Sequence, residues 1–228
     1  MNGLTRSFLG MSLLIPLLGV GSPAMAEFKG FTPSNPLFGD QTVGNASIVV
    51  RTVTGTREDD TRALNFQDDV YHNELIATED ESAAEITFLD ETTIKIGAAA
   101  AIVLDQFVYD PDPSNSSFVI TITEGTLRFT SGVLPDNAYE IRTPVATIGV
   151  RGTIIVVMVG RETLGDGTVF TRVNLSVVDG EADLIDCKGR VTLVPTSLSS
   201  TVEGSAEGCS EASELLPIDV TELYGTNR

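Results

Sequence analysis

The chain has 228 residues and carries 14 Lys and Arg against 32 Asp and Glu, which gives a formal net charge of −18. An acidic chain of this kind repels phosphate groups, so nucleic acids and anionic lipid surfaces are poor partners for it. The length allows one sizeable core, and the charge would suit a basic protein patch or divalent cations.

The first segment, residues 1–26, has the order of parts of a secretory signal peptide. Arg6 supplies a positive start, an apolar stretch runs from Phe8 to Val20, and Ala24–Ala26 has the small residues of a cleavage site. The apolar stretch is too short for a membrane anchor, and later apolar segments are far shorter than the about 20 residues that span a bilayer. We therefore expect cleavage after Ala26, a mature chain without a transmembrane segment, and a periplasmic or secreted product.

The next segment, residues 27–45, is rich in Gly, Pro, Ser and Asn, which predicts a linker. From Ala46 onward the sequence changes to short runs in which apolar and polar residues alternate. In Val173–Val177, for example, Val, Leu and Val alternate with Asn and Ser. This alternation predicts half-buried strands, and turn signals such as Asp179–Gly180 separate them. We predict one all-β domain over residues 46–194, either a sandwich or an irregular solenoid.

The last region, residues 195–228, is rich in Ser and Glu. Cys187 and Cys209 are the only two cysteines, and an even count in an exported protein predicts a disulfide near the C-terminal end of the domain. It would contribute about 3 kcal/mol in the chain-entropy model. We predict a loop under the disulfide and then an acidic, mobile tail, with a short docking segment at Leu215–Ile218 as the alternative.

Residues that could carry catalysis are few and scattered. His72 is the one histidine, so every His-based mechanism would depend on it alone, and we expect a surface histidine instead. No Cys/His cluster suggests zinc. Three acidic clusters lie in turn-like polar stretches where solvated carboxylates are ordinary: Glu58–Asp60, Asp68–Asp69 and Glu79–Glu81. We predict a non-enzymatic protein with no catalytic residue, no metal site and no cofactor.

A further acidic stretch, Tyr109–Asn115, invites comparison with a calcium loop. It departs from the EF-hand pattern, because the sixth loop position is Asn115 instead of Gly and the twelfth is Thr121 instead of Glu. A plain turn is the favoured interpretation, and a weak calcium site is left open.

The stretch Arg142–Thr153, RTPVATIGVRGT, combines a proline, two glycines and two arginines in an acidic chain. Its end resembles an anion-binding loop, but such loops precede a helix, and the β-branched run Ile154–Val157 favours a strand. We predict a structural β corner, in which proline ends a strand, glycine allows unusual φ values and arginine pairs with a carboxylate. Its motif residues are Arg142, Thr143, Pro144, Gly149, Arg151, Gly152 and Thr153.

The same stretch carries a resemblance to a known family. Ile141–Thr153 closely resembles the hallmark segment of the FecR-type periplasmic domain family. Other segments resemble family segments in the expected order: Asn73–Gly97, Leu104–Pro111, Glu124–Gly132 and Asp179–Glu181. The resemblance covers about residues 46–194 and implies an all-β domain with short strands, elongated and either β-solenoid-like or sandwich-like. It carries over no catalytic or metal residue, because the motif residues look structural.

The best-known members of that family are membrane-spanning regulators that relay a signal from an outer-membrane transporter to a cytoplasmic sigma factor. We expect this chain to differ from them in having neither the cytoplasmic anti-sigma segment, nor the internal membrane helix, nor a second domain after the β region. The resemblance implies a stand-alone exported FecR domain, an envelope signalling or protein-interaction module that binds an envelope protein through its strand edges. A periplasmic module that binds a small molecule or a glycan is the alternative.

Overall fold

The computed structural model describes residues 41–108, 115–205 and 207–218. All described residues belong to one compact unit, Asn35–Arg228. The predicted signal peptide, most of the predicted linker, and all but the last residue of the calcium candidate lie outside the described residues. In the described ranges no helix is long and apolar enough to cross a membrane.

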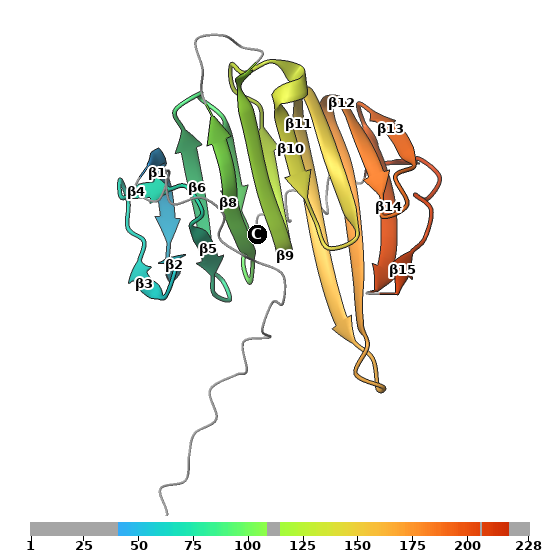
Figure 1. The fold of residues 1–228 in the computed structure, drawn as a ribbon, viewed down its shortest axis with the longest axis horizontal. Helices are drawn as coiled ribbons and strands as arrows, with labels where there is room; N and C mark the ends of the chain where they lie inside the picture. The colour runs from blue at the N-terminus through green and yellow to red at the C-terminus, as the bar shows by residue number, and fades with distance from the viewer. Residues whose placement is uncertain (1–40, 109–114, 206, 219–228) are drawn as a thin grey trace, which may run out of the picture. The chain divides into compact units, whose positions relative to one another are not determined.

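The described chain consists of β-strands and one short 3-10 helix, η2 (Asp136–Ala138). The strands belong to a single hydrogen-bonded sheet that is not closed (Figure 1). The all-β prediction is confirmed, whereas a solenoid-like arrangement is not shown. The strands are β1 (Thr42–Val50), β2 (Val53–Arg57), β3 (Asp60–Ala63), β4 (Asp69–Tyr71), β5 (Leu75–Thr78), β6 (Ala83–Phe88), β7 (Thr93–Ile96), β8 (Ala101–Val108), β9 (Ser117–Thr130), β10 (Tyr139–Arg142), β11 (Ala146–Thr163), β12 (Val169–Asp186), β13 (Val191–Pro195), β14 (Leu198–Ser205), β15 (Gly208–Cys209) and β16 (Leu216–Pro217).

Strand pairing divides this sheet into two layers that share their longest strands. The first half of β9 pairs with β8 and β10, and its second half pairs with β7 and β11. The first half of β11 pairs with β10 and its second half with β9. The first half of β12 pairs with β14 and its second half with β13, while β11 and β12 also pair with each other. The first layer has the order β3-β2-β5-β8-β9-β10-β11-β12-β13, and the second layer has the order β4-β1-β6-β7-β9-β11-β12-β14.

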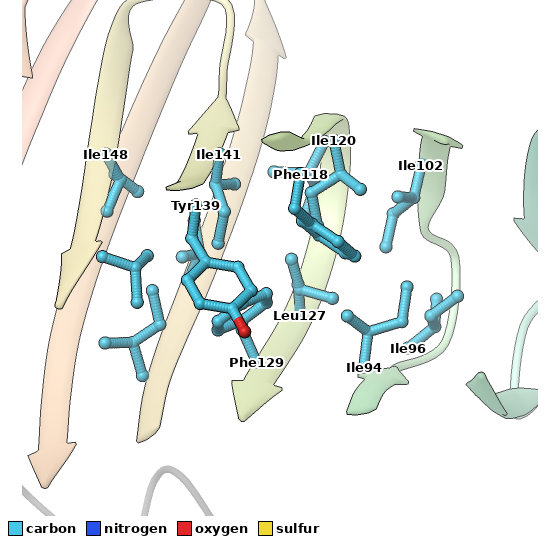
Figure 2. Close-up of a cluster of buried hydrophobic side chains, with 14 of the residues drawn as sticks. Ile94, Ile96, Ile102, Phe118, Ile120, Leu127, Phe129, Tyr139, Ile141 and Ile148 are labelled. Carbon is cyan, nitrogen blue, oxygen red and sulfur yellow. The ribbon is translucent and has the colours of Figure 1, made fainter. Parts of the chain in front are cut away.

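The two layers face each other across one hydrophobic core. Phe118 and Phe129 occupy the two halves of β9, and their ring centroids are 5.7 Å apart. A straight strand would separate these residues by more than about 30 Å, so β9 must fold back between them. Tyr139 of the first layer likewise lies 5.5 Å from Phe129 of the second. Figure 2 shows these rings among the buried Ile and Leu side chains that fill the core.

The long strands change layer at residues with left-handed backbone. Gly125 in β9, Gly152 in β11 and Gly180 in β12 have φ values of 92°, 54° and 82°. Connections between short strands of different layers also contain left-handed residues, and these are not glycines. They are Arg51, Gln67, Asn73, Glu81, Ala99 and Ser197.

Four observed strands, β1, β14, β15 and β16, begin where the sequence predicts a linker, a loop or a tail. β1 begins at Thr42, inside the predicted linker 27–45. Residues 198–205 were predicted to be a loop, but they form β14, in which Ser200 and Val202 are buried. The loop prediction is wrong there because backbone pairing with β12, from Val177↔Leu198 to Thr171↔Gly204, defines a strand that has little apolar content. The proposed limits of the domain and of its flanking regions stay predictions.

Candidate functional site

The stretch Arg142–Thr153 contains a tight turn followed by a layer crossing. The turn joins β10 to β11, and Thr143 closes it through three hydrogen bonds. Its N–H and its hydroxyl donate to the carbonyl oxygen of Ala146 at 2.9 and 2.7 Å, and its hydroxyl accepts from the N–H of Ala146 at 2.9 Å. β11 then crosses to the second layer at Gly152, where its pairing with β12 is interrupted.

The crossing brings three chain segments into close contact. The Thr153 hydroxyl donates to the carbonyl oxygen of Asp179, and the Thr153 N–H donates to Ser131 Oγ at 2.9 Å. Gly180 lies directly opposite. A Cβ atom there would lie 2.7 Å from the carbonyl oxygen of Gly152 and 2.8 Å from Thr153 Cβ. The crossing therefore leaves no room for a side chain at position 180 of β12.

The two arginines of this stretch bind different carboxylates and do not converge. Arg151 forms an ion pair with Asp183 of β12, and the hydrogen bond to that carboxylate raises the pKa of the guanidinium. Arg142 pairs with Glu140 of its own strand at 2.6 Å. These contacts are those of a corner between strands, and the importance of the motif residues for folding stays a prediction.

His72 is buried, with 8% of its surface exposed, so the expected surface position is wrong. Its position is in phase with the buried residues Val70 and Ile76, which is the sequence signal that could have revealed it. Burial lowers the pKa of His72, and the charge of Asp105 opposes this effect. Asp105 accepts a hydrogen bond from Thr121 Oγ1 at 2.5 Å, and burial raises the pKa of its carboxyl group.

A buried polar network, which has no local signal in the sequence, ties the β6–β7 turn to the segment before β10. Asp90 is 1% exposed, and its Oδ2 accepts from Thr92 Oγ1 at 2.6 Å and from the Tyr139 hydroxyl at 3.1 Å. The same hydroxyl accepts from the N–H of Leu134 at 3.0 Å, and burial raises the pKa of Tyr139. No local motif connects Asp90 with Tyr139, because they lie on different strand pairs.

A second buried acid lies near the other end of the sheet. Glu74 is fully buried, and its Oε1 accepts from Arg62 Nη2 at 2.9 Å while its Oε2 accepts from the N–H of Tyr71 at 2.9 Å. Both buried acids have their acceptor oxygens satisfied by donors of neighbouring strands, which fits a role in holding the strands together. The described residues contain no group of three His, Cys, Asp or Glu that could hold a metal ion.

The predicted disulfide is present and joins the two layers at the C-terminal end of the sheet. Cys187 in the β12–β13 turn is bonded to Cys209 in β15, with a Cα–Cα distance of 6.0 Å. Arg190 reinforces the link, since it forms ion pairs with Asp186 at 2.7 Å and with Glu211.

The segment after the turn at β15, residues 208–218, is here called the strap. It runs along the side of β14 that faces away from β12. Ser210 and Ser213 donate their N–H groups to the carbonyl oxygens of Glu203 and Thr201 at 2.7 and 2.8 Å. Their hydroxyls accept the N–H groups of the same two β14 residues at 3.1 and 3.0 Å. The strap thus satisfies the outer backbone groups of β14.

β13 is the last strand of the first layer, and no segment of the described chain covers its outer side. Among the described residues it pairs only with β12. Val191 and Leu193 are 59% and 47% exposed, whereas Val194 is fully buried. Proteins usually shield such edges, because unpaired backbone groups invite another strand. At this end of the sheet the edge of β14 is covered by the strap, whereas the edge of β13 is open among the described residues. This contrast makes β13 the candidate functional site.

The fold and the edge of β13 define the class of protein. It is an all-β domain in which a disulfide lies next to a strand that no described segment covers. The family model described as "FecR protein" matches residues 74–183. This part of the chain is therefore similar to the FecR family, and the resemblance seen in the sequence is confirmed.

Solved structures with a similar arrangement include two crystal structures, at 2.50 and 1.65 Å resolution, described as "a putative anti-sigma factor" from Parabacteroides distasonis ATCC 8503. Their sequence identities are 18% and 17%, and their TM-scores are 0.49 and 0.48. Each match covers 65% of this chain and 62% of the other chain, so this chain spans less than two thirds of those proteins. No curated protein matches the chain.

Proposed function

We propose that this protein is a non-enzymatic, exported FecR-domain module that binds another protein of the cell envelope and acts in signalling. The proposal includes a signal peptide cleaved after Ala26 and a periplasmic or secreted location. The family match over residues 74–183 supports the signalling role. The finer description of the fold, elongated and solenoid-like or sandwich-like, belongs to the same proposal, and the two facing layers support it.

The observation that carries this proposal is the open edge of β13. Exposed backbone groups on a strand edge bind another chain by extending the sheet, a mode that needs no special side chains. Val191 and Leu193 add exposed apolar surface to this edge. Nearby, the strap uses its own backbone and serine hydroxyls to cover β14, whereas β13 stays open in the part of the chain that the structure describes.

The proposed function is tested by crosslinking in intact cells followed by mass spectrometry. A carboxylate-reactive crosslinker suits this chain, which has 32 Asp and Glu. We expect one envelope protein to be recovered with the chain. The same protein should be absent from the crosslinked sample of cells in which the gene for this chain is deleted. Recovery of no protein, at a crosslinker dose that captures known envelope complexes in the same cells, would refute the proposal.

The alternative, a module that binds a small molecule or a glycan, has one feature in its favour. A shallow hollow of about 480 Å³ lies beside the β14–β15 turn, and Phe170 and Lys188 contribute to its lining. Phe170 is the single aromatic residue of this lining, whereas ligand sites are usually lined mainly by apolar and aromatic groups. A rise in melting temperature on adding an envelope glycan, lost in Phe170→Ala, would favour this alternative.

A further inference from the structure

We infer that the open edge of β13 and the strap together form a ledge that accepts one extended, basic segment of a partner protein as the next strand of the first layer. This inference rests on the proposed function and specifies its contact site. It depends on the direction of the backbone groups of β13, on the position of the strap, and on the charges around both.

The backbone groups that β13 directs outward follow from its pairing. Asp186 donates its N–H to the carbonyl oxygen of Arg190 at 3.0 Å, so this pair is hydrogen-bonded across the β12–β13 hairpin. Antiparallel partners alternate in this respect. The groups of Val191, Leu193 and Pro195 therefore point to the open edge. Proline is tolerated there because its missing N–H would have faced outward.

The strap makes the second layer one strand wider than the first at this end. It begins beside the start of β13, where the disulfide and the Arg190–Glu211 ion pair join them. It ends beside the other end of β13, where Ile218 donates its N–H to the carbonyl oxygen of Ser197 at 3.1 Å. A strand added to β13 would thus lie over the strap. The first layer would then be as wide as the second, so one added strand fits there.

The side chains around this ledge specify the occupant. On the outer face, an added strand would contact Val191 and Leu193, which favours apolar residues at alternate positions. On the inner face it would meet Ala212 and Cys209 of the strap, which pack against the core. These are small residues close to a filled core, so small side chains fit the inward positions of the added strand.

The charges around the ledge favour a basic segment. Glu181 stands opposite Pro195 at one end of β13, and Glu214 lies exposed on the strap. Arg190, the residue before β13, is already paired with two carboxylates. Because the whole chain carries a net charge of −18, lysines or arginines flanking the apolar centre of the segment complement both the local and the overall charge.

The first experiment uses a synthetic decapeptide with alternating Val and Ala at its centre and two lysines at each end. Binding is measured by fluorescence anisotropy, and amide hydrogen exchange is followed residue by residue. We expect binding, with slower exchange of the Val191 and Leu193 amides. A peptide with glutamates in place of the lysines should bind at least about tenfold more weakly. No binding, or binding without a change at these two amides, would overturn the ledge.

Variants separate the backbone contact from the side-chain contact. Leu193→Pro should retain the wild-type fold, because the lost N–H faces the open edge, and should weaken peptide binding by about tenfold or more. Leu193→Thr keeps the N–H and should weaken binding less. Ile48→Thr is the matched control, because Ile48 is also 47% exposed but lies on β1 at the other end of the sheet. Should Leu193→Pro fail to fold, amide exchange in the wild-type chain decides.

A photo-crosslinking residue placed at position 193 or position 48 in cells distinguishes the two proposals. Capture of an envelope protein from position 193 alone supports both. If the carboxylate crosslinker recovers a partner and position 193 captures nothing, the proposed function stands and the ledge is refuted. Should neither method recover any protein, the proposed function itself fails.

Discussion

The layer crossing of β11 and β12 predicts a graded series of glycine substitutions. Gly149, Gly152 and Gly180 lie within two paired strands but differ in backbone conformation and free space. A Cβ at Gly149 would lie 3.7 Å from its nearest neighbour, Asp183 Cβ, which is an ordinary contact. A Cβ at Gly152 would lie 3.0 Å from the flexible carboxylate of Asp136, and one at Gly180 would collide with backbone.

The magnitudes follow from these differences. Gly152→Ala adds mainly the strain of a left-handed residue, about 1–2 kcal/mol. Gly180→Ala adds the same strain and an overlap with backbone that costs about 1–3 kcal/mol more to relieve. Gly149→Ala needs neither and should change the free energy of unfolding by less than about 0.5 kcal/mol. The expected order of stability is therefore Gly149→Ala, then Gly152→Ala, then Gly180→Ala.

Urea unfolding of the oxidised protein, followed by circular dichroism, measures this series through the midpoint and its slope. Arg151→Ala belongs in the same experiment, because an exposed ion pair should contribute little to the free energy of unfolding. If Gly180→Ala were as stable as the wild type, or if Gly149→Ala were the most damaging of the three, the account of the crossing would be wrong.

Three other perturbations have defined outcomes. Cys187→Ser with Cys209→Ser, which opens a link between positions 22 apart, should lower the free energy of unfolding by about 3 kcal/mol in a comparison of urea midpoints; an unchanged midpoint would contradict this. Tyr139→Phe leaves the N–H of Leu134 and a carboxylate oxygen of Asp90 short of a partner and should cost about 1–3 kcal/mol, whereas Tyr71→Phe should cost less. His72 has a folded-state pKa below its unfolded value, so its contribution to stability is fully present above about pH 6.5 and is lost as pH falls from there through the folded-state pKa. Asp105 acts in the opposite sense, since its raised pKa adds stability only as pH falls toward the unfolded value. A melting curve of His72→Gln that kept the wild-type loss between pH 7 and 5 would refute the assignment to His72.

The sequence was sufficient for features that depend on local patterns. Alternation in Val173–Val177 and its counterparts predicted strands, because one face of each strand is buried and the other is not. The even cysteine count predicted the Cys187–Cys209 bond. β14 was missed because its sequence, LSSTVEGS, buries few apolar side chains and is defined by its neighbours on both sides.

Features that depend on distant segments could not be predicted in this way. The left-handed residues at Arg51, Glu81 and Ala99 have no sequence signal comparable to glycine, and the surrounding pairing imposes their conformation. The hydrogen bond between Asp90 and Tyr139 needs the β6–β7 turn and β10 to meet in space. The open edge of β13 is evident only from the strand pairing, which places the strap on β14 and not on β13.

The crossing of single strands between layers has a consequence for how the chain folds. In most sandwiches of two sheets, the facing side chains come from segments far apart in sequence, and loop closure makes their folding slow. Here Phe118, Phe129 and Tyr139 meet across the core although they belong to one stretch of 22 residues. The centre of the core can therefore assemble at the entropic cost of closing short loops. Segments on either side can then add to a nucleus that already has both layers.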